Sequence, residues 1–279
     1  MDRLEGHRRW FAQLVTANAG VLASERRLTD AFASTPRERF VGAGPWRVFT
    51  RIGYIETPSD DPALLYQDIT VALKSEQQIN NGQPTLHAVC LAALAVREGE
   101  AIVHVGAGTG YYSAILAQLT GSTGSVAAYE IDPELAERAR VNLAEYPNIR
   151  VHQRSGAEGL LPACDVLYVN AGATDPLDTW LDSLRPGGRL FFPLTPPQGP
   201  GAMLLVTRTA DDRLSARFVC GAMFIPCVGA RDDETGRKLS EAFLRGDMAK
   251  VQSLRRNTPP DPTAWCAGRS WWLSAAPAE

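Results

Sequence analysis

Three glycines at alternating positions, followed about twenty residues later by a carboxylate, are the residues of this chain best spaced to do chemistry. The segment from Val103 to Tyr111 reads VHVGAGTGY and contains Gly106, Gly108 and Gly110. Glycines let the backbone turn tightly and approach a ligand closely, because no Cβ intervenes. Glu130 ends the next apolar run, where its carboxylate can accept hydrogen bonds from two ribose hydroxyls. These residues predict a nucleoside-binding turn.

The spacing of the glycines separates two classes of cofactor. A dinucleotide site reads Gly-x-Gly-x-x-Gly, and its third glycine would fall here at Tyr111. The chain instead has Gly-x-Gly-x-Gly, the form associated with S-adenosylmethionine sites, where no pyrophosphate is held. The alternative is a glycine-rich turn that binds nothing, and the position of Glu130 argues against it.

The elements around these residues alternate between strand and helix. A strand over 101–105 leads into the glycines, a helix over 111–119 follows them, and a second strand covers 125–131. Asp132 is placed to cap a helix that begins at Pro133. Further elements are predicted as strand 149–153, strand 166–170, helix 176–184, turn 185–188 and strand 190–194.

This alternation predicts an α/β fold with a doubly wound, mostly parallel sheet, Rossmann-like in class. Ligands of such sheets bind at the carboxyl ends of the strands, where Gly106, Glu130, Ser155 and Asn170 fall. Strands over 203–208 and 217–228 have no helix between them and predict an antiparallel edge.

The flanking segments divide the chain into three predicted parts. Residues 1–95 hold two helical pieces before Phe40, a loop over 42–61, a polar loop over 77–84 and a helix over 84–94. Residues 96–230 form the core. Residues 231–279 hold a helix near 235–254 and a tail with Trp265, Trp271 and Trp272, expected to pack on the core or on a second subunit.

Composition excludes several classes of function. The 279 residues carry a net charge of −3, from 28 basic and 31 acidic side chains, which gives no electrostatic case for nucleic acid. The N-terminus has neither a signal peptide nor a transmembrane pattern, so no membrane association is expected. The five cysteines are scattered and lack metal-ligand spacing. We therefore expect no metal, no disulfide framework and a cytoplasmic location.

Four segments resemble the protein-L-isoaspartate O-methyltransferase family, over about residues 20 to 230. They are TDAFASTPRERFV from Thr29 to Val41, Gln83-Pro84 before a helix, the glycine loop with Glu130, and LRPGGRL from Leu184 to Leu190. The resemblance implies a class I methyltransferase that uses S-adenosylmethionine to methylate a carboxylate.

The resemblance also implies a set of site residues. The glycine loop would line the methionine part of the cofactor, Glu130 would hold the ribose, and Ser155 with Gly156 would lie beside the adenine. The full predicted cofactor set is His104, Gly106, Ala107, Gly108, Thr109, Gly110, Glu130, Ile131, Ser155, Gly156 and Asn170. The predicted catalytic set, in the acceptor loop, is Asn80, Asn81, Gly82 and Gln83.

Two positions depart from the family pattern. Aligned on Gln83-Pro84, the family's Thr-Ile-Ser becomes Asn80-Asn81-Gly82, so the serine linked to catalysis is a glycine here. The acidic residue two positions before the first glycine is His104, which is either a buried, hydrogen-bonded histidine or a pH-sensitive contact.

A carboxylate acceptor has a pKa near 4, so it is already ionised and needs alignment rather than a general base. Three hypotheses follow for the chain: an isoaspartyl methyltransferase, a relative redirected to another carboxylate in a modified peptide or small molecule, or a non-catalytic binding protein. The intact cofactor residues argue against the third, and the sequence leaves the acceptor and the oligomeric state open.

Overall fold

The computed structural model describes residues 3–278, which form two compact units. Unit one contains residues 3–99 and 107–153, and unit two contains residues 100–106 and 154–278. Helices and strands are mixed in both units, so the predicted α/β class is confirmed.

Four helices belong to the N-terminal part of unit one. They are α1 (Arg3–Asn18), α2 (Arg26–Ser34), the short α3 (Glu38–Val41) and α4 (Pro84–Leu94). The two predicted helical pieces and the helix after Gln83 are confirmed. Phe11 and Phe32 are fully buried and meet edge to face, which fixes α1 against α2.

The loop predicted over 42–61 is partly wrong, because it contains an antiparallel hairpin. Strands β1 (Arg47–Thr50) and β2 (Gly53–Glu56) pair through Val48 opposite Ile55 and Phe49 opposite Tyr54. β-Branched and aromatic residues favour this pairing. The short strands β3 (Ala72–Lys74) and β4 (Ile79–Asn80) form a second hairpin, and 3-10 turns cover Pro62–Leu65 and Ser75–Gln77.

The cofactor-loop half of unit one follows the prediction closely. Helix α5 (Tyr111–Thr120) comes after the glycines, and strands β6 (Ser125–Glu130) and β7 (Ile149–Gln153) pair in parallel. Helix α6 (Pro133–Asn142) begins where expected, because the Asp132 carboxylate accepts the Leu135 N–H at 3.0 Å.

Unit two is built on a sheet whose strands lie in the order β13-β14-β12-β11-β10-β9-β8-β5. Strands β5 (Ala101–Val105), β8 (Cys164–Val169) and β9 (Leu184–Leu194) are parallel. Strands β10 (Gly201–Arg208) and β11 (Leu214–Ala222) continue antiparallel, which confirms the predicted antiparallel edge. The strand predicted over 217–228 is wrong in its last part, because β11 ends at Ala222.

Helix α7 (Asp178–Ser183) is shorter than the predicted helix 176–184, and the turn predicted over 185–188 lies inside β9. Leu184 pairs with Cys164 while Arg189 pairs with Val166, so the segment between them bulges out of the ladder. Gly187, with φ of +80°, lets the chain bulge without leaving the strand.

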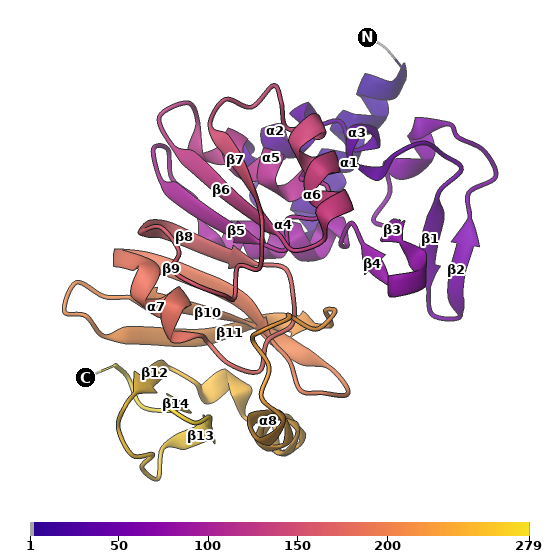
Figure 1. The fold of residues 1–279 in the computed structure, drawn as a ribbon. Helices are drawn as coiled ribbons and strands as arrows, with labels where there is room; N and C mark the ends of the chain where they lie inside the picture. Colours follow the sequence, from indigo (N-terminus) through magenta and orange to yellow (C-terminus); the bar gives the residue numbers. More distant parts are fainter. Residues whose placement is uncertain (1–2, 279) are drawn as a thin grey trace. The chain divides into compact units, whose positions relative to one another are not determined.

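The C-terminal segment extends the same sheet (yellow in Figure 1). It contains α8 (Asp233–Arg245), a 3-10 turn (Met248–Lys250), β12 (Ser253–Arg256), β13 (Ala264–Ala267) and β14 (Trp271–Ser274). The helix predicted over 235–254 is therefore wrong in its second half. Gly246 and Asp247 both have positive φ, which ends the helix and frees the chain to form β12.

The three tail tryptophans are packed, as predicted. Trp265, Trp271 and Trp272 are 7%, 4% and 2% exposed. Each indole N–H also has an acceptor: Gly246 O for Trp265, the Asp175 carboxylate for Trp271 and Thr258 for Trp272. The tail is thus part of the core of unit two.

Candidate functional site

Glu130 lies at the end of β6 and holds the glycine loop by its side chain. One carboxylate oxygen accepts the Gly108 N–H at 2.7 Å, and the other accepts the Asp132 N–H at 2.9 Å. The residue is 7% exposed. Because each carboxylate oxygen can accept about two hydrogen bonds, each has room for a further donor such as a ribose hydroxyl.

The electrostatic setting of Glu130 combines burial with backbone donors. Burial raises the pKa of this carboxyl group, and the N–H groups of Asp132 and Gly108 act in the opposite direction by stabilising the ionised form. The charge is therefore held by fixed backbone dipoles rather than by a neighbouring cation.

Thr109 and Gly110 of the loop are held by contacts inside unit one. Thr109 donates its hydroxyl to Phe40 O at 2.5 Å, and its own carbonyl accepts the Asn142 side chain at 3.0 Å. Gly110 has φ of +99°, and a Cβ there would lie 2.7 Å from the Leu143 side chain, so only glycine fits. Ile131, which follows Glu130, is 49% exposed.

Two members of the predicted set in unit two, His104 and Gly106, lie next to a third, Asn170. Its side-chain amide donates to His104 Nε2 at 2.7 Å, and its backbone N–H donates to Val105 O at 2.8 Å. Gly106 has φ of +75°, and a Cβ there would contact the Asn170 backbone at 3.4 Å. The Asn170 side-chain oxygen is buried and has no partner among the described residues.

His104 corresponds to the buried, hydrogen-bonded alternative. It is fully buried and stacks on Tyr168 with ring centroids 5.5 Å apart. Burial lowers the pKa of His104 to about 3, so the imidazole is neutral near pH 7 and its Nε2 accepts the hydrogen bond from Asn170.

Ser155 and Gly156 form a rigid turn after β7. Ser155 is 8% exposed and its hydroxyl accepts the Ala157 N–H at 3.1 Å. A Cβ on Gly156 would lie 2.5 Å from Val105, and the Gly156 carbonyl accepts the Trp180 indole N–H at 2.8 Å.

The three side chains of the acceptor loop, those of Asn80, Asn81 and Gln83, differ in the contacts they make. Asn80 accepts from the Tyr54 hydroxyl at 2.7 Å and donates to Gln78 O at 2.8 Å. Gln83 donates to Asp68 at 3.0 Å. Asn81 is 6% exposed, and its side-chain N–H₂ has no partner within residues 3–278. The uncommitted buried donor of this loop is therefore Asn81.

Gly82 lies against a histidine. It has φ of +51°, and a Cβ there would lie 2.2 Å from His87 Nε2. His87 is 2% exposed and stacks on Tyr112 with ring centroids 3.6 Å apart, so it has little freedom to move away. A serine does not fit this conformation.

The chain is similar to a known family of methyltransferases over most of its length. Residues 12–232 match the model of the Protein-L-isoaspartate(D-aspartate) O-methyltransferase family. The chain belongs to this family. It is therefore an S-adenosylmethionine-dependent methyltransferase, and the family predicted from the sequence is confirmed.

Individual relatives agree over most of the chain. A protein-L-isoaspartate O-methyltransferase of Brucella anthropi is 29% identical over 207 residues, which are 74% of this chain and 87% of that protein. One from Aeropyrum pernix is 31% identical over 213 residues, 75% of each chain.

Solved structures of the family share the fold. A protein-L-isoaspartate O-methyltransferase structure matches with a TM-score of 0.66 and 22% identity, covering 89% of this chain and 72% of that one. A β-aspartate methyltransferase from Plasmodium falciparum, in complex with S-adenosyl-L-homocysteine, gives 0.62 and 15%, covering 80% and 98%. The fold is thus that of the class I methyltransferases, as predicted.

Sequence reasoning missed one ion pair beside the loop of this methyltransferase. Lys74, at the end of β3, contacts both oxygens of Asp132 and, at 2.9 Å, Glu134. Asp132 was expected only to cap a helix. Burial raises the pKa of Asp132, but hydrogen bonds from Lys74 and Leu135 outweigh it, so the pKa is lowered. No sequence spacing links Lys74 to Asp132.

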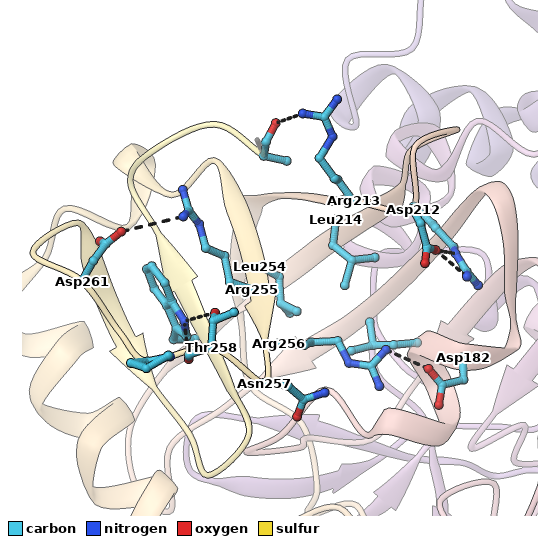
Figure 2. Close-up of a pocket in the computed structure, with 15 residues that line it drawn as sticks. Asp182, Asp212, Arg213, Leu214, Leu254, Arg255, Arg256, Asn257, Thr258 and Asp261 are labelled. Atoms are coloured by element: carbon cyan, nitrogen blue, oxygen red, sulfur yellow. Dashed lines mark hydrogen bonds and ion pairs between the residues drawn. The ribbon is translucent and has the colours of Figure 1, made fainter.

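The methyltransferase also has a pocket of about 570 Å³ in the C-terminal part of unit two, and none of the predicted site residues lines it (Figure 2). Its arginines are already paired: Arg256 with Asp182 at 2.7 Å and Arg208 with Asp212 at 2.5 Å. Arg255 lies over the Trp272 ring, 3.7 Å from Asp261. These arginines therefore have carboxylate partners, and the Arg256–Asp182 pair joins β12 to α7.

Two general properties complete the description. Within residues 3–278, no cluster of three or more His, Cys, Asp or Glu side chains is placed to hold a metal ion. No described helix has the length and apolarity needed to cross a membrane.

Proposed function

We propose that this methyltransferase acts on the free carboxylate of L-isoaspartyl residues in proteins or peptides. The observation that carries the proposal is the buried side-chain N–H₂ of Asn81, which has no partner among the described residues. Glu130, a buried carboxylate bonded to the glycine loop, supports the binding of the methyl donor. The relatives named above are protein-L-isoaspartate O-methyltransferases, which supports the acceptor class.

The residues present fit S-adenosylmethionine, which supplies an electrophilic methyl group on a sulfonium. Glu130 would bind the ribose hydroxyls. The buried Asn170 oxygen, which has no partner among the described residues, would accept from the ammonium of the methionine part. The amide oxygen is uncharged, so it would offer the ammonium a hydrogen bond where the neutral His104 offers no negative charge. The remaining predicted cofactor residues, including Ile131, Ser155 and Gly156, stay part of this proposal.

Asn81 is the residue we assign to the acceptor. An ionised carboxylate needs a hydrogen-bond donor and exclusion of water, and a buried amide N–H₂ without a partner offers both. Asn80 and Gln83 are engaged elsewhere, so they would shape the loop rather than contact the acceptor. No proton has to be removed from the acceptor at neutral pH.

The compartment is also a proposal. All five cysteines are free thiols, which supports a reducing, cytoplasmic environment. The division of the chain into an N-terminal part, a methyltransferase core and a C-terminal part, with boundaries after residues 95 and 230, remains a prediction.

Cofactor binding tests the role of Glu130. Titration calorimetry with S-adenosylhomocysteine should show Glu130→Gln weakening binding by about 1.5–3 kcal/mol, because a charged acceptor of hydrogen bonds is lost. Glu137→Gln, on the exposed face of α6, is the matched control and should bind like the unchanged protein. If Glu130→Gln and the unchanged protein bound S-adenosylhomocysteine equally well, the assignment of Glu130 to the ribose would be wrong.

Methyl transfer tests the acceptor. Labelled S-adenosylmethionine should methylate an isoaspartyl peptide and leave its normal aspartyl twin unmethylated. Asn81→Ala should lower kcat by at least about tenfold with little change in S-adenosylhomocysteine affinity. Transfer to neither peptide by a protein that binds S-adenosylhomocysteine would point to a different carboxylate acceptor.

A further inference from the structure

The β1–β2 hairpin, which Figure 1 shows beside β3 and β4, carries three exposed apolar side chains. Phe49 is 49% exposed, Ile52 at the tip is 95% exposed and Ile55 is 56% exposed. Single exposed apolar residues are ordinary on protein surfaces, but a concentration on one short hairpin marks an interaction site.

The base of the hairpin is firmly rooted in unit one. Val48 is 8% exposed and forms a β-bridge with Val71, and the Phe49 N–H donates to Thr70 O at 2.9 Å. Trp46, which precedes β1, belongs to a buried cluster with Val41, Leu65 and Val71. The exposed tip therefore projects from a fixed base.

The outer edge of β2 is open. In the described part of the chain β2 pairs with β1 alone. Because the Phe49 N–H points to Thr70, away from β2, the Phe49–Tyr54 pair is a non-hydrogen-bonded pair of the ladder. The backbone N–H and C=O groups of Tyr54 and, two residues on, Glu56 then point to the open edge.

This edge is attached to the acceptor loop. The Tyr54 hydroxyl donates to the Asn80 side chain at 2.7 Å, next in sequence to Asn81. Arg47 lies over the Tyr54 ring and donates to Ser75 at 2.8 Å, in the turn between β3 and β4. The open strand and the acceptor loop are thus joined by side-chain contacts within one unit.

We propose that the open edge of β2 binds the polypeptide chain of the methyl acceptor as an added antiparallel or parallel strand, with Ile52 and Ile55 contacting its side chains. The inference rests on the proposed function, because it needs a peptide or protein acceptor. Backbone hydrogen bonds recognise a polypeptide chain whatever its side chains are. Apolar contacts at the tip add affinity with little sequence preference.

The test compares isoaspartyl peptides of two lengths, about twelve and about four residues, since only the longer can span a strand of typical length. The unchanged protein should show a higher kcat/KM for the longer peptide. The double variant Ile52→Ser/Ile55→Ser should reduce that advantage about five- to tenfold, because apolar burial is lost. Leu244→Ser, at an apolar side chain 87% exposed on α8, is the control and should keep the advantage.

A backbone variant tests the edge itself. Glu56→Pro removes one outward N–H without removing a β1–β2 hydrogen bond, and it should likewise reduce the advantage of the longer peptide. Circular dichroism and thermal unfolding would show that the variant is folded. An unchanged advantage in folded Glu56→Pro and in the double isoleucine variant would overturn the proposal.

Two further measurements separate the remaining outcomes. Fluorescence anisotropy with the labelled longer peptide and S-adenosylhomocysteine measures binding without turnover. Weaker binding to the variants would support the edge even if no peptide is methylated, in which case only the isoaspartyl chemistry has failed. Sedimentation velocity showing a dimer that Ile52→Ser abolishes, with peptide binding unchanged, would assign the edge to a second copy of the chain and overturn the proposal.

Discussion

Lys74 and Asp132 are 58 positions apart in the chain, yet Lys74 Nζ lies 2.8 and 2.7 Å from the two Asp132 carboxylate oxygens. The Asp132 backbone N–H in turn donates to Glu130. Leu73, beside Lys74, lies 3.3 Å from where a Cβ of Gly108 would be. The strand that leads to the acceptor loop is thus bonded to Asp132, whose backbone N–H is bonded to Glu130, the residue that holds the cofactor loop.

Replacing Lys74 by Met should weaken S-adenosylhomocysteine binding about three- to fivefold, because Asp132 and the strand beside Gly108 lose their restraint. Lys74→Arg should retain most of the affinity. Calorimetry at low and high salt checks both, since the loss should be larger at low salt. Lys238→Met, which breaks an exposed pair with Glu234, is the control. A similar loss of affinity in Lys74→Met and Lys238→Met would argue against a specific role of Lys74 in cofactor binding.

Restoring the family's serine with Gly82→Ser should destabilise the protein by about 1–3 kcal/mol, because its Cβ meets His87 and the backbone φ is positive. Thermal unfolding measures the loss. Gly187→Ser shares a positive φ but has nothing within 4 Å of its Cβ, so it separates backbone strain from the clash. Equal losses at both positions would mean that His87 contributes nothing.

The candidate cofactor residues of the sequence analysis rest on local spacing. The glycines and Glu130 could be recognised because a strand, a turn and the next strand place them at fixed offsets. Lys74 could not be found this way, since its partner is a long-range contact that no periodicity encodes. The acceptor loop could be predicted only in part. The sequence places its four residues together before a helix, but only the three-dimensional contacts distinguish Asn81 from Asn80 and Gln83.

The misplaced elements have local causes. The segment 235–254 has apolar residues at helical spacing, yet Leu254 is buried in a strand opposite Leu273. Two consecutive residues with positive φ, Gly246 and Asp247, end the helix, and only the glycine could have signalled this. The β1–β2 hairpin was missed because it is short and lies among glycines and prolines that favour loops.

His104 should make folding stability depend on pH. Its pKa is about 3 when folded, because of burial, and about 6.5 in an unfolded chain. Between these values the unfolded chain binds a proton that the folded chain does not, so stability falls as the pH drops below about 6.5, by about 1.4 kcal/mol per unit. Urea unfolding at about pH 7 and pH 5 should show His104→Gln losing about 2 kcal/mol less than the unchanged protein. His7→Gln, at an exposed histidine, is the control and should lose as much stability as the unchanged protein. Identical losses in the unchanged protein, His104→Gln and His7→Gln would refute the role given to His104.

The tail should contribute to the stability of unit two rather than to cofactor binding. Trp272 is 2% exposed on β14, which pairs with β12, and its indole N–H donates to Thr258. Trp272→Ala should therefore cost about 3–5 kcal/mol of unfolding free energy, as large aromatic truncations in cores do. Trp10→Ala is the matched control, because Trp10 is 63% exposed on α1 and its loss should cost less than about 1 kcal/mol. Urea unfolding measures both, and calorimetry with S-adenosylhomocysteine on the folded variants should give unchanged affinity. A small loss of unfolding free energy in Trp272→Ala would contradict the packing of the tail. A large loss of S-adenosylhomocysteine affinity in a well-folded Trp272→Ala variant would instead make the tail part of the cofactor site.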